Sequence, residues 1–442
     1  MSTIVALSTP IGRGAIAVVR LSGGLSLSIA KALCVELDNV KARHATLSEI
    51  RYPQTGEILD EVLITFFEGP HSVTGEDVVE ISCHGSPAVV RQILDLTLHL
   101  GARLADPGEF TLRALSNHKI NLSQAEAIRD LIAAQTQAAV KQASRQIGGE
   151  LSTRLDQFKD LLIKVIVLLE SALEFVEDDL PLTEVNLIEE RLGYVRNGIN
   201  GLAQSYAAGR LLQEGIKVAI VGSPNVGKSS LFNRLVDQDR AIVTPLPGTT
   251  RDTLSHSIDI GGVPVVLTDT AGLRETNDGI ERLGIERTHK TINDADLVLN
   301  VLECTDQSVG ALDHANKIPS LTVLNKCDLQ VSSHGPKHQE GIRVSALTGE
   351  GLDTLRAAIL QILNRGNVDH EGLVITNARH YNLLKCATQE IDEALELIGR
   401  RASEELILVP LNNALKFLGQ ITGEITTEDI LSQIFSTFCI GK

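Results

Sequence analysis

Apolar positions follow two different periods along the chain, and the change from one to the other divides it into segments. Short apolar runs between turn residues predict three strands in the first 118 residues, at 18–21, 62–67 and 78–81. Pro87 to Leu100 has helical spacing and ends at Gly101. From Leu122 to about Tyr206, apolar residues recur every three or four positions, the period of one helix face. The pattern predicts a small α+β domain followed by a helical bundle.

The next segment, from residue 216 to about 366, alternates strands and helices again. Five short, nearly continuous apolar runs are typical of buried parallel strands: 217–221, 265–269, 297–302, 321–325 and 342–345. Helical spacing then returns in three stretches, 383–398, 408–418 and 430–438, with Thr426 and Asp429 as a capping box for the last. The order predicts one split helical bundle into which an α/β domain is inserted.

Composition narrows the choice of function. The chain has 442 residues, a formal charge of −16, 3% aromatic residues and no Trp. Such a chain has neither an aromatic platform for single-stranded nucleic acid nor a surface that grips nucleic acid over its whole extent, so any RNA contact requires a local basic patch or a partner protein. The six cysteines show no CxxC spacing, and the N-terminus has no basic region before its apolar residues. We expect a cytoplasmic protein without a membrane span.

A phosphate-binding loop is the clearest chemical motif. Residues 222–229 read Gly-Ser-Pro-Asn-Val-Gly-Lys-Ser, directly after a predicted strand and before a predicted helix. This context is the one in which the motif holds phosphates with backbone N–H groups. Lys228 is expected to reach the β- and γ-phosphates, and the Ser229 hydroxyl is expected to bind Mg²⁺.

Three further motifs at strand ends predict which nucleotide binds. Asp269-Thr-Ala-Gly272 supplies a carboxylate that holds Mg²⁺ through water and a backbone N–H for the γ-phosphate. Asn325-Lys-Cys-Asp328 supplies a carboxylate that accepts from the N1–H and amine of guanine, a donor pair that adenine lacks. Ser345-Ala346-Leu347 supplies a backbone N–H for the guanine O6. The four motifs in this order predict a GTPase related to translation factors.

The residue that orients the attacking water in Ras-like GTPases is absent, because Leu273 follows Gly272. Glu281 is the nearby candidate, although such a residue is also a common surface carboxylate. The stretch 242–252 is the predicted first switch, where Thr250 can complete the Mg²⁺ shell. The Asn225 carboxamide, with carbonyls of residues 244–249, can cage a monovalent cation in place of an arginine finger. The alternative for Asn225 is an amide that stabilises the turn.

The chain resembles the MnmE (TrmE) tRNA-modification GTPases over essentially its whole length. The last five residues, Phe-Cys-Ile-Gly-Lys, are the most telling match, because GTP hydrolysis does not require them. The other matches are Thr3-Ile-Val-Ala, Gly12-Arg-Gly, Arg20-Leu-Ser-Gly, Thr74-Gly-Glu-Asp77, His84-Gly85, Pro107-Gly-Glu-Phe110, Asn225, Gly248-Thr-Thr-Arg-Asp252 and Asp269-Thr-Ala-Gly-Leu-Arg274.

The resemblance implies three parts and a set of partners. It implies an N-terminal folate-binding and dimerising domain (1–118), a helical domain in two parts (119–214 and 368–442) and a Ras-like G domain (215–367). It also implies a homodimer that acts with the FAD protein MnmG as a heterotetramer. The reaction adds an aminomethyl or carboxymethylaminomethyl group to carbon 5 of the wobble uridine of certain tRNAs. A 5-formyl- or methylene-tetrahydrofolate supplies the one-carbon unit, and K⁺ stimulates GTP hydrolysis through G-domain pairing.

The resemblance also assigns roles to residues. K⁺ would be bound by Asn225, Thr244, Leu246 and Thr249, and Mg²⁺ by Ser229 and Thr250. Catalytic roles fall to Glu281, Arg274 and Cys439, the last as a reactive thiol. The folate site would comprise Arg20, Glu80, Lys119 and Lys442. The remaining residues expected around GTP are Val226, Gly227, Lys228, Ser230, Pro245, Pro247, Gly248, Asp269, Thr270, Ala271, Gly272, Asn325, Lys326, Asp328, Ser345 and Ala346.

Three alternatives stay open at the level of sequence. Without the family resemblance, the residue types alone predict that Arg20 and Glu80 form a cross-strand ion pair. A GTP-switched ribosome-assembly factor of the Era type would carry a basic RNA-binding domain beside its G domain, whereas the flanking segments here are helical and unremarkable in charge. A folate-dependent one-carbon transferase with a merely regulatory G domain would turn over without the flavoprotein.

Overall fold

The computed structural model divides the chain into two compact units. The described residues are 2–35, 37, 40–52, 55–174, 182–238, 255–269, 294–304, 318–329, 341–363, 372–424, 428–439 and 441. The first unit comprises residues 1–129, 147–152 and 419–442, and the second comprises residues 130–146 and 153–418. Across these described stretches, no helix combines the length and the apolar character that crossing a bilayer requires.

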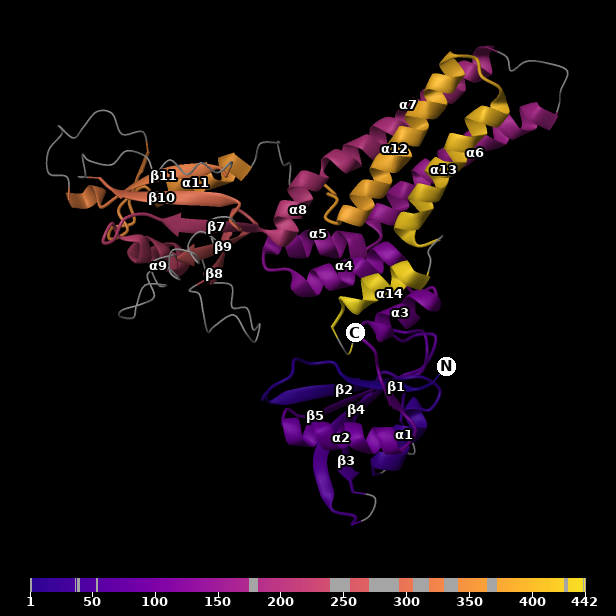
Figure 1. Cartoon of the computed structure of the whole chain (residues 1–442). Coiled ribbons are helices and arrows are strands. Elements are labelled where there is room, and N and C mark those ends of the chain that lie inside the picture. The colour runs from indigo at the N-terminus through magenta and orange to yellow at the C-terminus, as the bar shows by residue number, and fades with distance from the viewer. Residues whose placement is uncertain are drawn as a thin grey trace. The chain divides into compact units, whose positions relative to one another are not determined.

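The first unit contains a mostly antiparallel sheet in the order β3-β4-β5-β2-β1-β6 (Figure 1). Its strands are β1 (Ile4–Leu7), β2 (Ile16–Ser22), β3 (Ala45–Arg51), β4 (Ile58–Phe67), β5 (Val78–His84) and β6 (Arg103–Leu104). Neighbouring strands run antiparallel, except that β1 and β6 are parallel. The strands predicted at 18–21, 62–67 and 78–81 are confirmed as parts of β2, β4 and β5.

Helices cover one face of this sheet because its strands alternate buried and exposed positions. α1 (Ser26–Leu33) and α2 (Pro87–His99) pack into one apolar core with β2, β4 and β5. The predicted helix is therefore confirmed to within one residue of its end, and Gly101 follows it with a φ of 99°.

Helices from both ends of the chain meet at the other side of the first unit. α3 (Glu109–Ser116) packs Phe110 against Ile4 and Ala6 of β1. α14 (Glu428–Ser436) lies almost at the C-terminus, and Phe435 packs with Phe438 and with Ala125 of α4 (Leu122–Ala133). The last residues of the chain are thereby held beside the N-terminal sheet. The proposed cap residue Thr426 lies outside the described residues.

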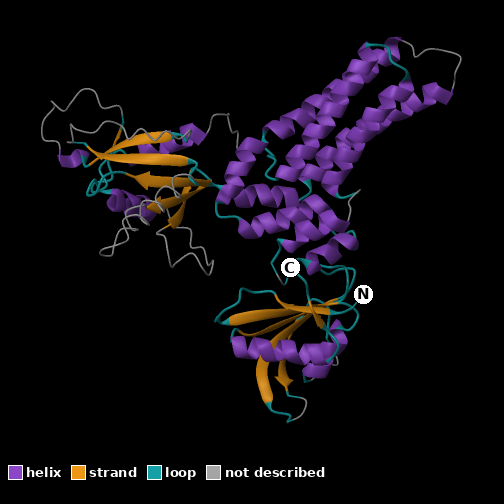
Figure 2. Ribbon diagram, viewed as in Figure 1, coloured by secondary structure: helices purple, strands orange, loops and turns teal. Residues whose placement is uncertain are grey.

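Four long helices of the second unit run beside one another (Figures 1 and 2): α6 (Glu150–Glu174), α7 (Leu182–Gln204), α12 (Ala378–Gly399) and α13 (Glu404–Thr422). Two shorter helices, α5 (Gln137–Ile147) and α8 (Tyr206–Glu214), lie at one end of these four. Arg196 of α7 pairs with Asp392 of α12. The rings of Tyr206 and Tyr381 stack with centroids 4.5 Å apart, so α8 also contacts α12. These helices pack together although about 160 residues separate α8 from α12 in sequence.

The residues between α8 and α12 form the second sheet, in the order β12-β11-β10-β7-β9-β8. Its strands are β7 (Ile216–Val221), β8 (Ser255–Ile260), β9 (Val263–Asp269), β10 (Leu297–Glu303), β11 (Ser320–Asn325) and β12 (Ile342–Arg343). Apolar residues of α9 (Lys228–Gln238) and α11 (Leu352–Leu363) share one core with these strands. The five predicted strands are the five parallel ones.

Two details of this sheet differ from the sequence prediction. β12 ends at Arg343, so the run predicted to reach Ser345 is shorter, and Ser345 instead lies in the loop that follows. β8 was not predicted, and it pairs antiparallel with β9. Its sequence, Ser-His-Ser-Ile-Asp-Ile, is largely polar, because an edge strand is not enclosed on both sides as the central strands are.

Candidate functional site

The phosphate-binding loop connects β7 with α9, as its position after a buried strand predicts. At Gly227, where φ is 91°, an added Cβ would lie 2.3 Å from Nδ2 of Asn325, so the position requires glycine. Lys228 is the first residue of α9 and is buried, and its Nζ donates to the Ser223 carbonyl at 2.8 Å. The ammonium group therefore folds back over the loop at the amino end of a helix, where anions bind.

Asn225, at the crest of this loop, is exposed and has a φ of 65°. Asparagine is among the few non-glycine residues that tolerate this left-handed conformation, so the residue type suits the turn. The hydrogen bonds found among the described residues involve neither atom of its carboxamide. The same residue therefore shapes the turn and presents an oxygen to the solvent side of the loop. Ser229 and Ser230 are also exposed, at the start of α9.

Asn325, at the end of β11, joins two loops of the site. Its side chain is buried, and Nδ2 donates to the carbonyls of Val226 at 2.9 Å and Gly227 at 3.4 Å. Its Oδ1 accepts the N–H of Ala346 at 3.1 Å. One carboxamide thus fixes the phosphate-binding loop to the Ser345–Ala346 loop. The sequence marked Asn325 as a nucleotide contact, but it did not indicate this bridging role.

The next residues of the motif are oriented by their own partners. Lys326, with a φ of 64°, extends its Nζ to Glu303 at 2.9 Å. Asp328 accepts a hydrogen bond from the hydroxyl of the fully buried Ser345 at 2.5 Å. Asp328 lies in a short 3₁₀ turn, Cys327–Leu329, and is itself exposed. The exposed carboxylate is therefore held in one orientation, as guanine recognition requires.

Asp269 is the last residue of β9, in register with Ile220 of β7, so its backbone lies beside the strand that leads into the phosphate-binding loop. The other predicted nucleotide, metal and catalytic residues of this region lie outside the described residues: Thr244, Pro245, Leu246, Pro247, Gly248, Thr249, Thr250, Thr270, Ala271, Gly272, Arg274 and Glu281.

Arg20 and Glu80 are brought together in the first unit, on neighbouring strands β2 and β5. They are in direct register, and both Nε (2.9 Å) and Nη2 (2.8 Å) of Arg20 contact Oε1 of Glu80. The cross-strand ion pair that residue chemistry alone suggested is thus confirmed. The guanidinium also lies 5.7 Å from the centroid of the Phe110 ring. Oε2 of Glu80 has no hydrogen-bond partner among the described residues.

The C-terminal segment lies against the end of β1. The carbonyl of Gly441 accepts from the Ser8 hydroxyl at 3.1 Å, and a Cβ on Gly441 would lie 2.2 Å from the Leu7 carbonyl. With a φ of 94°, this position requires glycine. Leu7 is paired with Val19, the neighbour of Arg20, so the chain end approaches the Arg20–Glu80 pair. Lys442 lies outside the described residues.

The other two residues assigned to this end of the molecule have different surroundings. Cys439 is exposed, and its carbonyl accepts from the Gly108 N–H at 3.4 Å. Lys119 donates from Nζ to the Pro70 carbonyl at 2.8 Å, so it contacts the 68–77 loop. The structure shows no direct contact of Lys119 with Arg20 or Glu80 among the described residues.

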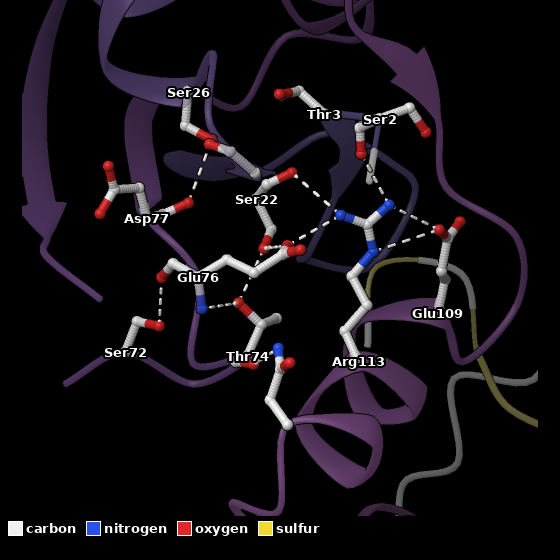
Figure 3. Close-up of polar contacts among 12 residues, drawn as sticks. Ser2, Thr3, Ser22, Ser26, Ser72, Thr74, Glu76, Asp77, Glu109 and Arg113 are labelled. Carbon is white, nitrogen blue, oxygen red and sulfur yellow. Dashed lines mark hydrogen bonds and ion pairs between the residues drawn. The ribbon is translucent and has the colours of Figure 1, made fainter. Parts of the chain in front are cut away.

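A buried charged network supports the same loop, and sequence reasoning did not find it. Figure 3 shows the Arg113 guanidinium between two carboxylates: Nη1 donates to Glu76 and Nη2 to Glu109, at 2.8 and 2.9 Å. The Arg113 side chain is only 5% exposed. Ser22 donates to the same oxygen of Glu76 and shares a hydrogen bond with Thr74. The one available signal is the i,i+4 spacing of Glu109 and Arg113, which becomes a pair on one face only because the structure folds this segment into α3.

Glu109 stays ionised in this network. Burial by itself raises the pKa of a carboxyl group, but here hydrogen bonds outweigh it. The donors are Arg103, the Asp106 N–H and Arg113, and together they hold the pKa of Glu109 below its ordinary value. The network therefore connects the 68–77 loop to α3 through charges that persist at neutral pH.

The contacts in the second unit define the class of protein: a P-loop GTPase in which Asn325 ties the Asn-Lys-Cys-Asp turn to the phosphate-binding loop. The profile described as "MnmE helical domain" matches residues 122–439, and that of the "GTP-binding protein TrmE N-terminus" matches residues 3–119. The chain belongs to the family of MnmE tRNA modification GTPases, and it is a GTP hydrolase.

Relatives of this family match from end to end. The chain is 43% identical over 450 aligned positions to the tRNA modification GTPase MnmE of Koribacter versatilis (strain Ellin345), covering 100% of this chain and 99% of that protein. It is 41% identical over 446 positions to that of Aquifex aeolicus (strain VF5), covering 99% of both. The G domain of the T. maritima FeoB iron transporter is 29% identical over 33% of this chain and 97% of that chain, with a TM-score of 0.24, too low to bear on the fold.

Proposed function

We propose that this chain is a K⁺-stimulated GTPase that acts, with the FAD protein MnmG, on the wobble uridine of certain tRNAs. It adds a carboxymethylaminomethyl or aminomethyl group to carbon 5, and a tetrahydrofolate derivative supplies the one-carbon unit. The protein works in the cytoplasm as a homodimer within a heterotetramer. The observation that carries this proposal is the pair of loops joined by Asn325, in a chain whose relatives are named for tRNA modification.

The order of the elements supports a G domain inserted in a split helical domain. α7 and α8 contact α12, although β7 to α11 lie between them in sequence. We assign residues 119–214 and 368–442 to the helical domain, 215–367 to the G domain and 1–118 to the folate-binding domain. This arrangement attaches both ends of the G domain to one helical body, so a change in G-domain pairing can reach the helices.

The residues present suit the ions that the proposal requires. The exposed Asn225 carboxamide suits K⁺, with the carbonyls of Thr244, Leu246 and Thr249 as further oxygen ligands. Ser229 follows Lys228 at the start of α9, where it suits Mg²⁺ together with Thr250. K⁺ would place positive charge where the transition state of phosphoryl transfer gathers negative charge. Glu281 organises the attacking water in this proposal.

Replacing K⁺ with Na⁺ should slow GTP turnover by at least about tenfold, because a preorganised positive charge at the transferred phosphate is lost. Steady-state phosphate release in matched chloride salts measures this effect, with GDP affinity measured in both salts. The variant Asn225→Gly keeps the left-handed turn but removes the carboxamide, so it should turn over equally slowly in both salts. Equal rates for the wild-type protein in K⁺ and Na⁺, or an unchanged K⁺ response in Asn225→Gly, would contradict the K⁺ site.

The Arg20–Glu80 pair suits a folate. Both contacts from Arg20 end on Oε1 of Glu80, so Oε2 is left to accept the amine and N–H donors of a pterin edge. The pair is partly exposed, at 20% and 28%, and Lys119 and Lys442 supply cations for the glutamyl carboxylates. Cys439, exposed beside this end of the molecule, is the candidate reactive thiol.

Glu80→Gln should weaken binding of 5-formyl-tetrahydrofolate to the full-length protein by about tenfold or more, because a charge-assisted hydrogen bond becomes a neutral one. Isothermal titration calorimetry measures the affinity. Glu49→Gln is the matched control, because Glu49 also pairs with an arginine of the same sheet but lies on β3. Equal affinity of wild type and Glu80→Gln would leave Glu80 with a structural role only.

A further inference from the structure

Two thiols face each other beside the guanine-recognition turn. Cys304 directly follows β10, and Cys327 opens the turn after β11; their Sγ atoms lie 3.0 Å apart. Cys327 also contacts the Leu324 carbonyl through Sγ at 3.2 Å. Cys304 is buried, at 3% exposure, whereas Cys327 is partly exposed. Each cysteine lies just beyond the end of one of two adjacent parallel strands, so the pairing of β10 with β11 brings the two side chains together.

The backbone joins both cysteines to the residues that bind the nucleotide. The N–H of Cys304 donates to the carbonyl of Asn325 at 2.8 Å, and the N–H of Cys327 donates to that of Val344 at 3.2 Å. Cys327 lies between Lys326 and Asp328 in sequence. A displacement of Cys327 therefore acts directly on the turn that presents the Asp328 carboxylate.

We propose that Cys304 and Cys327 form an intramolecular disulfide on oxidation by a hydroperoxide, and that this bond weakens guanine-nucleotide binding. In the first step the thiolate of the partly exposed Cys327 attacks one peroxide oxygen and the O–O bond breaks, so that Cys327 becomes a sulfenic acid. The leaving hydroxide takes up the proton that the Cys327 thiol released and becomes water. In the second, Sγ of Cys304 attacks that sulfur, the S–O bond breaks, and the hydroxyl leaves as water with the proton of the Cys304 thiol. Two thiols and one hydrogen peroxide thus give one disulfide and two waters.

The two thiols differ in the way that this order requires. Burial raises the pKa of the Cys304 thiol to about 11, and its contact with the Cys327 thiol adds to this increase. Cys304 is therefore almost wholly protonated at neutral pH and reacts poorly with peroxide directly. Its contact with Cys327 makes it the resolving thiol instead, and closure of the disulfide should become faster as the pH rises toward 11.

The bond changes the geometry of the turn. A disulfide has an S–S length of about 2.05 Å, so the two sulfurs must approach by about 1 Å from their present separation. Cys304 is buried in an apolar cluster with Leu302 and Leu324, whereas Cys327 packs against the outside of that cluster and is partly exposed, so the Cys327 turn moves further. This movement distorts the hydrogen bond between Asp328 and Ser345 and the hydrogen bonds of the Asn325 side chain. Nucleotide affinity should fall about tenfold, within the range usual for coupled sites.

Coupling between two sites is reciprocal, which gives a second readout. If the disulfide lowers GDP affinity tenfold, saturating GDP must disfavour the disulfide by the same factor. For a two-electron couple, a tenfold change in the equilibrium between dithiol and disulfide corresponds to about 30 mV in the reduction potential. The potential of the disulfide is therefore lower by this amount in the nucleotide-free protein than in the GDP-bound protein. Bound GDP should therefore raise the potential at which the disulfide is reduced.

The test uses the full-length, nucleotide-free protein treated with hydrogen peroxide. Mass spectrometry of a non-reducing digest should show the peptides of Cys304 and Cys327 linked. Titration with fluorescent mant-GDP should show a dissociation constant about tenfold higher, restored by dithiothreitol. Cys304→Ala should bind GDP normally and lose the response, while Cys386→Ala, a partly exposed cysteine of α12, should keep it.

Each other outcome overturns part of the proposal. If no linked peptide forms, the two thiols are merely packed together. If the peptides link while GDP affinity is unchanged, the disulfide is not coupled to the site. A peroxide response that persists in Cys304→Ala would assign the effect to another oxidation product. If Cys304→Ala fails to bind GDP when reduced, the wild-type protein alone tests the proposal. Its digest must then show the linked peptides, and dithiothreitol must restore its GDP affinity.

Discussion

Asn325→Ala should raise the dissociation constant for GDP by about 30- to 1,000-fold, the result of losing two or more buried hydrogen bonds at about 1–2 kcal/mol each. The change removes the donor to the Val226 and Gly227 carbonyls and the acceptor for the Ala346 N–H. Both loops of the nucleotide site then lose their common anchor, so the phosphate and guanine contacts weaken together. Equilibrium titration with mant-GDP measures the effect.

Two companion variants separate anchoring from loss of folding. Asn325→Asp keeps an oxygen for the Ala346 N–H but cannot donate to Val226, so its affinity should fall between those of wild type and Asn325→Ala. Asn412→Ala is the matched control: its Nδ2 also donates to a backbone carbonyl, but it lies exposed on α13, outside the nucleotide site. If Asn325→Ala binds GDP within about twofold of wild type, the hydrogen bonds of Asn325 do not contribute to nucleotide affinity, and the prediction is wrong.

The second sheet could be predicted from sequence because enclosed parallel strands have a simple signature. β10 is buried over its first six residues, and its sequence is a nearly unbroken apolar run. β8 carries no such run, since only Ile258 and Ile260 of its six residues are buried. Ser345 shows the opposite limit. It is fully buried, and its hydroxyl donates to Asp328 and accepts from the Thr348 N–H, contacts that hydropathy does not predict.

The candidate sites divide along similar lines. The four GTPase motifs are local in sequence, so their spacing alone predicted a guanine-nucleotide site. The Arg20–Glu80 pair joins residues 60 positions apart, and only the register of β2 and β5 brings them together. The thiol contact between Cys304 and Cys327 likewise depends on the pairing of β10 with β11. Contacts of this kind are set by tertiary structure and leave no periodic trace in the sequence.

Arg113→Met should destabilise the first unit by about 3 kcal/mol, because it leaves the partly buried Glu76 without its cation and removes one of the two cations, Arg113 and Arg103, that contact the buried Glu109. Glu76 and Glu109 both contact this guanidinium, whose side chain is 5% exposed. Arg51→Met is the matched control, since its partner Glu49 lies at the surface, and its loss should cost at most about 1 kcal/mol. Amide hydrogen exchange measures the loss of stability in both variants, because it reports the opening of strands β1 and β2 separately from that of the second unit.

Acid should reduce the difference between wild type and Arg113→Met. The pKa of Glu109 is lower in the folded protein than in the unfolded chain, so its contribution is complete above the unfolded value of about 4.3. That contribution is lost as the pH falls through the lower folded pKa, since protonation removes the charge that Arg113 neutralises. The two proteins should therefore converge in stability toward low pH. A difference that stays constant from neutral pH down to about pH 3 would mean that Arg113 stabilises the unit by packing and not by charge.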